Sequence, residues 1–246
     1  MQEQYLTRVT LKRDKIRDFN QYPFSIPAVK GLEALPLHKN VTFLVGENGM
    51  GKSTLIEAIA VNLGFNAEGG SRNFNFETYH SHSVLSEFIL ISKGVKHPSD
   101  GYFLRAESFY NVASNIEELD GIPSGAPAIK QSYGGSLHQC SHGESFFALL
   151  NNRLGGHGVY LFDEPEAALS PQRQLAMLCR IDELVKQDSQ LIIATHSPIL
   201  TAYPNSMIYT LSETGIQQTD YQQTENYQIT KQFLNNYSNM LKNLLE

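Results

Sequence analysis

The chain has 246 residues, enough for one large domain or two small ones with a sizeable hydrophobic core. Hydrophobic residues make up 41% of it and charged residues 18%, which is typical of an ordinary soluble globular protein. The net charge of −6 excludes a global basic field that would attract nucleic acid or anionic membrane. A local basic cluster at Arg8, Lys12, Arg13, Lys15 and Arg17 leaves two interpretations open, a DNA contact and a solvated strand edge or turn.

Cysteine spacing and hydropathy bear on the compartment. Cys140 and Cys179 lie far apart and have no CxxC partner, so we expect two buried thiols in a reducing cytosol rather than a disulfide. The chain opens without the charged and apolar regions of a secretory signal, and no segment reaches the roughly 20 apolar residues of a membrane span. We therefore expect a cytoplasmic protein with no direct membrane insertion.

Predicted strands and helices alternate along the chain. Strands are expected at residues 5–11, 41–45, 101–107, 159–162 and 190–195, and helices at about 51–63, 145–154, 172–186 and 227–245. We expect a loop with short extended pieces at 18–37, a surface loop at 69–77, a linker at 122–135 and a hairpin from 207–211 and 215–221. Three strands are continuous apolar runs, which is typical of a parallel sheet covered by helices. The fold class is therefore α/β, with antiparallel additions near the N-terminus.

Residues 42–60, TFLVGENGMGKSTLIEAIA, contain the pattern G-x-x-x-x-G-K-[ST] between an apolar strand and a helix. Glycines there let backbone N–H groups turn inward around a β-phosphate, the lysine bridges the β- and γ-phosphates, and the serine hydroxyl ligates Mg²⁺. The helix that follows adds its N-terminal dipole to the anion site. The predicted ATP-binding residues of this loop are Gly46, Glu47, Asn48, Gly49, Met50, Gly51, Lys52, Ser53 and Thr54.

Residues 159–165, VYLFDEP, form a second motif in which an apolar strand ends in two acids. In a P-loop sheet, such a strand presents a second Mg²⁺ ligand, here Asp163, and the next acid, Glu164, is placed to polarise a water for attack on the γ-phosphate. By itself the segment could be an acidic turn at a strand end. Because it follows a phosphate loop, the metal-binding and catalytic interpretation is favoured.

Residues 192–198, IIATHSP, place His196 at the carboxyl end of another buried strand. Ligands bind at that edge of an open α/β sheet. A lone histidine there would usually be structural. As the third motif in this order, it is predicted to contact the γ-phosphate.

The three motifs GENGMGKST, LFDEPEAALSP and ATHSP resemble those of the ABC-type P-loop ATPases, over residues 41–200. The likeness is greater to the soluble branch with SMC-like, RecF-like and OLD-like proteins than to transporter cassettes. It implies a single P-loop NTPase domain, residues 1–246, whose mostly parallel core sheet is covered by helices. An N-terminal antiparallel β part and a small helical signature lobe at about 108–155 are also implied.

The family's LSGGQ-like signature, which contacts ATP bound to the opposite subunit, is matched here by residues 140–144, CSHGE. The resemblance assigns Ser141, Gly143 and Glu144 to ATP, although His142 replaces a glycine. An ordinary capping box from Ser141 to Glu144 is compatible with that role. The resemblance also assigns residues 166–170 to a contact across the dimer.

Other family features are weakly matched. No glutamine stands where the family places its Mg²⁺-contacting one, and Glu107 is the nearest substitute as a metal ligand, with a surface turn as the alternative. Tyr22, Phe24 and Lys30 are candidates for an adenine contact, but aromatic residues there more often pack under a proline-rich loop. His80 and His82 lack a third ligand nearby, which disfavours a metal pair. The interval between Glu107 and Ser141 is too short for coiled-coil arms.

The sequence thus predicts a magnesium-dependent ATPase that closes into a homodimer around two ATP molecules and acts as a nucleotide switch. Three roles remain open. The first is DNA maintenance or phage defence with an effector or nuclease partner, and it is favoured by the soluble-branch motifs. The others are a transporter's nucleotide-binding subunit and a non-hydrolysing assembly module.

Overall fold

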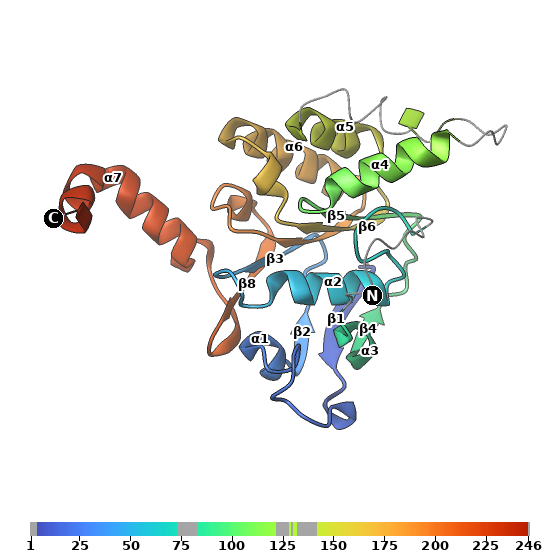
Figure 1. The fold of residues 1–246 in the computed structure, drawn as a ribbon, viewed down its shortest axis with the longest axis horizontal. Helices are drawn as coiled ribbons and strands as arrows, with labels where there is room; N and C mark the ends of the chain where they lie inside the picture. Colours follow the sequence, from blue (N-terminus) through green and yellow to red (C-terminus); the bar gives the residue numbers. More distant parts are fainter. Residues whose placement is uncertain (1–3, 73–82, 122–127, 129, 132–141, 246) are drawn as a thin grey trace.

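The computed structural model describes residues 4–72, 83–121, 128, 130–131 and 142–245. They form three layers, with a six-stranded sheet in the middle (Figure 1). Helices α4, α5 and α6 lie over one face of this sheet, and α2 with a second, antiparallel sheet lies over the other. The expected α/β fold with an N-terminal antiparallel part is confirmed.

The six-stranded sheet has the order β5-β6-β7-β3-β8-β9. Its strands are β3 Val41–Val45, β5 Asp100–Arg105, β6 Gly158–Asp163, β7 Gln190–Ala194, β8 Ser206–Ser212 and β9 Gly215–Gln218. All pairs are parallel except the β8–β9 hairpin. Every residue of β3, β6 and β7 is buried, which explains why these strands read as continuous apolar runs.

Two hydrophobic cores flank this sheet, because alternate strand residues point to opposite faces. One core lies against α4 Phe109–Asp120, α5 His142–Asn152 and α6 Pro171–Lys186. The other lies against α2 Lys52–Asn62 and the antiparallel sheet. In α6, Pro171 follows the capping residue Ser170, whose side chain accepts a bond from the amide of Arg173, so the sequence itself fixes where this helix begins.

The N-terminal sheet has the order β2-β1-β4, with β1 at Leu6–Leu11, β2 at Ala34–Pro36 and β4 at Ile89–Lys93. The short helix α1 Pro27–Lys30 packs against the β8–β9 hairpin, and α3 Leu85–Phe88 packs against α2 and leads into β4. Neither helix was expected from the sequence, since four residues are too few to show a helical period.

Helix α4 lies within the segment 108–155 that the sequence assigns to a helical lobe, and its apolar residues pack as part of the core beside α5. One expectation needs correction. Cys179 is exposed on α6, so the prediction of two buried thiols is wrong for this residue, while Cys140 lies outside the described residues. The predicted linker at 122–135 also lies almost wholly outside them.

Helix α7, Glu225–Leu245, extends away from the three layers and contains a kink at Asn236 (Figure 1). It has no buried residue. Within the described parts of the chain, no helix combines the length and the apolar character that a membrane span requires.

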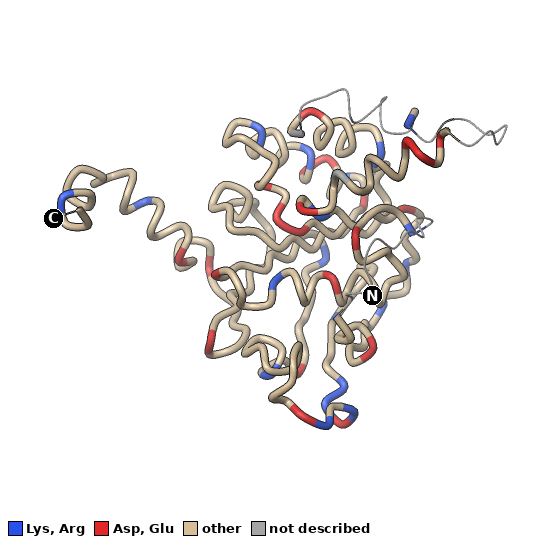
Figure 2. Tube along the Cα trace, in the orientation of Figure 1, with Lys and Arg blue, Asp and Glu red and all other residues tan. Residues whose placement is uncertain are grey.

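Charges of both signs are interspersed along the trace (Figure 2). In the N-terminal basic cluster, Lys12 and Arg13 donate to main-chain carbonyls, Lys12 Nζ to Glu87 O at 3.0 Å and Arg13 Nη1 to Lys30 O at 2.6 Å. The Arg13 guanidinium also lies 4.6 Å from the centroid of the Phe19 ring. These contacts favour the structural interpretation of the cluster.

Candidate functional site

The phosphate-binding loop follows β3 and leads into α2, as predicted. Two of its glycines are required by close contacts as well as by positive φ angles. A Cβ at Gly46 (φ 143°) would clash with the carbonyl oxygen of Leu211, and one at Gly51 (φ 92°) would lie 2.7 Å from Ile26. The loop therefore packs closely between β8 and the N-terminal segment, and it leads directly into α2.

Lys52, the first residue of α2, folds back into this loop. Its ammonium donates to the carbonyl of Gly46 at 2.9 Å and to that of Glu47 at 3.0 Å, and only 3% of the residue is exposed. Burial lowers the pKa of Lys52, and the charges of Glu164 and Asp163 partly oppose that shift. A cation held in a ring of inward-facing backbone groups is suited to bind phosphate oxygens.

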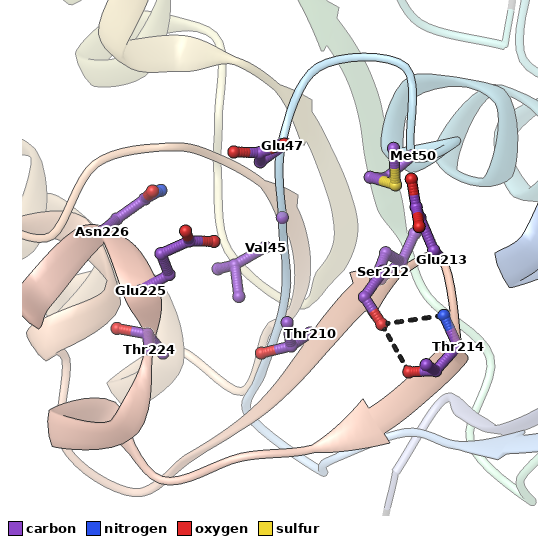
Figure 3. A pocket seen from close by; sticks show the side chains of 12 residues that line it. Val45, Glu47, Met50, Thr210, Ser212, Glu213, Thr214, Thr224, Glu225 and Asn226 are labelled. Atoms are coloured by element: carbon purple, nitrogen blue, oxygen red, sulfur yellow. Dashed lines mark hydrogen bonds between the residues drawn. The ribbon is translucent and has the colours of Figure 1, made fainter. Parts of the chain in front are cut away.

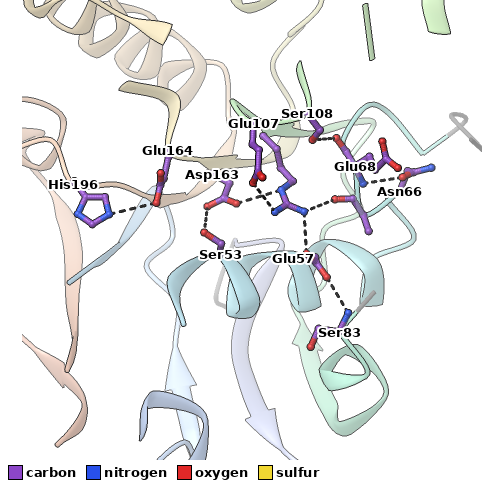
Figure 4. Close-up of polar contacts among 12 residues, drawn as sticks. Ser53, Glu57, Asn66, Glu68, Ser83, Glu107, Ser108, Asp163, Glu164 and His196 are labelled. Carbon is purple, nitrogen blue, oxygen red and sulfur yellow. Dashed lines mark hydrogen bonds and ion pairs between the residues drawn. The ribbon is translucent and has the colours of Figure 1, made fainter. Parts of the chain in front are cut away.

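Ser53 and Asp163 meet across the gap between α2 and the end of β6. The Ser53 hydroxyl donates to Asp163 Oδ1 at 3.0 Å (Figure 4). Asp163 is 5% exposed, and burial raises its pKa to about 6, although the Arg105 charge and the bond from Ser53 act in the opposite direction. A hydroxyl and a buried carboxylate are hard oxygen donors that suit Mg²⁺, which needs few protein ligands when phosphates supply the rest.

Glu164 and His196 also lie together at this edge. The His196 Nε2 atom is 3.4 Å from Glu164 Oε1, although it makes no aligned hydrogen bond. Glu164 has a left-handed backbone (φ 50°), and its amide donates to the carbonyl of Ala194 at 2.9 Å. Glu164 therefore has a backbone conformation that is strained for a residue with a side chain, and strain of this kind clusters at functional sites.

Glu166 is a residue whose place the sequence did not reveal. One carboxylate oxygen accepts from the Thr195 hydroxyl at 2.7 Å, and the other accepts from the His196 amide at 2.5 Å. Glu166 therefore ties the Glu164 turn to His196 within one chain, and the contact of residues 166–170 across a dimer stays a prediction. Asn226 donates to the carbonyl of His196 at 2.8 Å, so the start of α7 also holds this histidine.

Glu107 shares a cavity of about 410 Å³ with Ser53, Asp163 and Glu164. Its side chain is 87% exposed and lies 3.6 Å from Arg105 Nη2 (Figure 4). Its assignment as a metal ligand stays a prediction. Across the described residues, no group of three or more His, Cys, Asp or Glu side chains is arranged to hold a metal ion by itself.

A second cavity, about 320 Å³ in volume, lies on the other side of the phosphate-binding loop (Figure 3). Glu47 and Met50 of the loop line it, together with the β8–β9 hairpin and the first residues of α7. Of the adenine candidates, Phe24 is buried and packs edge-on against Phe88, with 4.9 Å between the two ring centroids, whereas Tyr22 is 67% exposed. Phe24 therefore belongs to the core, as the alternative interpretation expected.

The predicted signature residues lie at the start of α5. Gly143 lies against Arg173 and the carbonyl of Ala168, where a Cβ would clash with the guanidinium, and Glu144 is 3.9 Å from Arg173. Ser141, His80 and His82 lie outside the described residues. The structure thus brings the three P-loop motifs together and places the described signature residues beside α6 instead.

Two family models match the chain. One, described as an AAA domain, matches residues 15–118, and the other, described as an AAA ATPase domain, matches residues 145–201. The first range contains the phosphate-binding loop, and the second contains Asp163, Glu164 and His196. Both matches therefore fall on the residues that form the site.

Two curated proteins are related in sequence. The hemin import ATP-binding protein HmuV of Idiomarina loihiensis is 24% identical over 208 residues, which cover 76% of this chain and 77% of that protein. An uncharacterized ABC transporter ATP-binding protein of Haemophilus influenzae is 34% identical over 85 residues, which cover 34% of this chain and 32% of that protein. The second match thus spans about a third of either chain.

Solved structures share the fold at low sequence identity. The cbiO1 protein of Clostridium perfringens, part of the ABC transporter complex cbiONQ, aligns with a TM-score of 0.50 and 17% identity over 94% of this chain and 95% of that one. The SMC head domain from Thermotoga maritima aligns with a TM-score of 0.46 and 16% identity over 88% of this chain and 99% of that one. The first similarity shows the fold, and the second is too loose to distinguish branches within it.

Proposed function

Because the chain belongs to the ABC-type P-loop ATPases, we propose that it binds ATP with Mg²⁺ and hydrolyses it to ADP and phosphate. The observation that carries this proposal is the convergence of Lys52, Ser53, Asp163, Glu164 and His196 at the carboxyl edge of one parallel sheet. The first of the three motifs lies more than a hundred positions before the other two, and together they supply a cation, oxygen ligands for a metal and a general base, as phosphoryl transfer to water needs.

The phosphates of ATP lie on the loop from Gly46 to Thr54, with Lys52 across the β- and γ-phosphates. The two cavities flank this loop, so the γ-phosphate reaches the one beside Asp163 and Glu164, and the nucleoside extends toward the other. Ser53 and Asp163 would hold Mg²⁺, which would supply positive charge to neutralise the phosphate oxygens.

Glu164 orients the attacking water and accepts its proton, because its carboxylate faces the cavity beside Ser53. His196 lies beside Glu164 and stabilises charge on the γ-phosphate. Glu166 and Asn226 hold the His196 backbone, so the imidazole keeps its place as the phosphate leaves.

A homodimer completes the site in this proposal. Ser141, Gly143 and Glu144 of one subunit contact the ATP bound by the other, and hydrolysis releases the pair. The described start of α5 supports this arrangement, since a helix N-terminus is suited to bind phosphate. The ATP-bound dimer and the ADP-bound monomers are the two states of the switch.

We propose that the switch serves DNA maintenance or phage defence and acts through an effector or nuclease, as the soluble-branch motifs favour. A second candidate is the ATP-binding subunit of a membrane transporter. It is favoured by the similarity to a hemin import ATP-binding protein over 76% of the chain. The protein captured by an ATP-trapped form separates the two, since a transporter subunit would retain a membrane permease.

The Glu164→Gln variant tests the ATPase proposal directly. Loss of the general base should lower turnover by about 100-fold or more while ATP binding persists, so the variant should elute as a dimer with Mg²⁺–ATP. Turnover is measured by phosphate release and the dimer by sizing chromatography with light scattering. Glu183→Gln, on the exposed side of α6, is the matched control. Wild-type turnover in Glu164→Gln would contradict the assignment.

A further inference from the structure

Arg105 is a half-buried cation that the three motifs do not include. It ends β5 and lies directly beside Asp163, which ends the neighbouring β6. Its guanidinium contacts carboxylates from three elements: Glu57 of α2 at 2.9 Å, Asp163 at 3.4 Å and Glu107 at 3.6 Å (Figure 4). The Arg105 side chain is 17% exposed, so its contacts with Glu57 and Asp163, which are themselves little exposed, form with little water around them.

The anchoring of Arg105 does not depend on Asp163. Its Nη1 atom donates to Glu57 Oε2 at 2.9 Å and to the carbonyl of Ala67 at 3.1 Å. Glu57 is itself held, because its other oxygen accepts from the amide of Ser83 at 3.2 Å. The guanidinium is therefore fixed from the side away from the site, and its Nε atom remains to face Asp163.

The two oxygens of Asp163 have different neighbours. Oδ1 accepts from the Ser53 hydroxyl at 3.0 Å, and Oδ2 lies 3.4 Å from Arg105 Nε. This Nε atom makes no aligned hydrogen bond to any described residue, so its contact with Oδ2 is electrostatic. Because one oxygen faces the serine and the other faces a fixed cation, the carboxylate can present only Oδ1 toward the phosphate-binding loop.

We propose that Arg105 is a positioning residue for the metal of the bound nucleotide: it fixes Asp163 from behind so that Oδ1 and the Ser53 hydroxyl form one ready-made pair of ligands. This inference rests on the proposed function. The planar guanidinium performs the task because it can bind Glu57 and Asp163 at once, which the single ammonium of a lysine cannot do with the same geometry.

The alternative is that Arg105 only balances charge. A cation this close to a bound metal repels it, so a mere counter-ion would weaken metal binding, and its removal would tighten it. Positioning predicts the opposite sign, because a carboxylate that rotates freely loses its preset geometry. The sign of the change in metal affinity therefore separates the two interpretations.

The test measures Mn²⁺ binding by electron paramagnetic resonance in the presence of a non-hydrolysable ATP analogue, together with analogue binding in EDTA. Arg105→Gln should weaken Mn²⁺ binding about tenfold and leave metal-free analogue binding within about twofold. Arg105→Lys, which retains the charge, should weaken Mn²⁺ binding about threefold. Arg153→Gln is the matched control, since Arg153 is 21% exposed and pairs at 2.9 Å with Asp100 at the opposite end of β5.

Unchanged or tighter Mn²⁺ binding in Arg105→Gln would overturn the inference, and so would an equal loss in Arg153→Gln. If circular dichroism shows that Arg105→Gln does not fold, Arg105→Lys is the deciding variant. Weaker Mn²⁺ binding by Arg105→Lys supports the positioning role, and wild-type Mn²⁺ binding contradicts it. Failure of the wild-type protein to bind the analogue would instead contradict the proposed function, so the two failures are distinguishable.

Discussion

The two ends of the paired strands β5 and β6 each carry an aspartate, Asp100 half-buried at one end and Asp163 buried at the other, and the two have different hydrogen-bond partners. At the first end, Asp100 accepts from Arg153 Nη1 at 2.9 Å, from the Tyr160 hydroxyl at 2.8 Å and from the amide of Gly155 at 3.3 Å. At the carboxyl end, Asp163 accepts from Ser53 and lies beside Arg105 without an aligned hydrogen bond. Both oxygens of Asp100 therefore accept hydrogen bonds, whereas among the described residues only Oδ1 of Asp163 does so.

The pKa values of the two aspartates shift in opposite directions. Burial alone would raise the pKa of Asp100, but the bonds from Arg153 and Tyr160 outweigh it and the pKa is lowered. Burial raises the pKa of Asp163 to about 6, because its partners compensate only in part. A buried carboxylate without full compensation is the one that gains most from a metal ion, which is why perturbed groups mark functional sites.

Among the substitutions that test this comparison, Lys52→Ala should have the largest effect, on ATP binding at the carboxyl ends of the parallel strands. Removing the ammonium leaves the phosphates of ATP without their cation, so nucleotide affinity should fall by about 100-fold or more. Titration with a fluorescent ATP analogue measures this. Lys186→Ala, which removes an exposed ion pair to Asp182 on α6, is the control and should bind normally. Normal binding by Lys52→Ala would contradict the assignment of the loop.

Asp100→Asn, at the opposite end of β5, should lower the stability of the protein without changing its affinity for ATP. Because the pKa of Asp100 is lowered on folding, its ionised form stabilises the protein above the unfolded value of 3.8, and the contribution is lost as the pH falls below about 4. We expect a loss of about 2 to 3 kcal/mol in the free energy of unfolding, constant between pH 8 and 5. Urea denaturation measures this free energy. Weaker binding of the ATP analogue by Asp100→Asn would contradict the view that this aspartate serves stability alone.

Asp163→Asn should have the smallest effect and the opposite sign. Because the pKa of Asp163 is raised to about 6, ionisation costs folding free energy above that pH, and the cost disappears as the pH falls toward 4. In EDTA at pH 8 the variant should therefore be more stable than the wild type by about 1 to 2 kcal/mol. This gain should shrink between pH 8 and 5, where the Asp100→Asn loss stays constant. A lower free energy of unfolding for Asp163→Asn than for the wild type at pH 8 would contradict this prediction.

Local patterns made much of the fold predictable. The apolar runs at β3, β6 and β7 are fully buried strands, as continuous hydrophobicity indicates. The Ser170–Pro171 pair marks the start of α6. The short helices α1 and α3 were not predicted, because four residues are too few to show a helical period in the sequence.

The site divides in the same way. Spacing alone predicts the roles of residues inside a local motif, such as Lys52 with its glycine loop or Glu164 beside Asp163. Glu166 and Arg105 do not, because their roles depend on neighbours far away in the chain: Thr195 and His196 for one, Glu57 and Asp163 for the other. No local spacing can encode such a contact.

The sequence by itself therefore determined which groups are predicted to bind phosphate, because the geometry of a phosphate loop is set by glycine conformations and helix N–H groups within nine adjacent residues. The tertiary structure decided how the acids around that loop are held. Strand register places Arg105 beside Asp163, and the turn after β6 carries Glu166 to His196. The physical reason is distance: an ion pair or hydrogen bond forms between atoms a few ångströms apart, and only the folded sheet brings these atoms together.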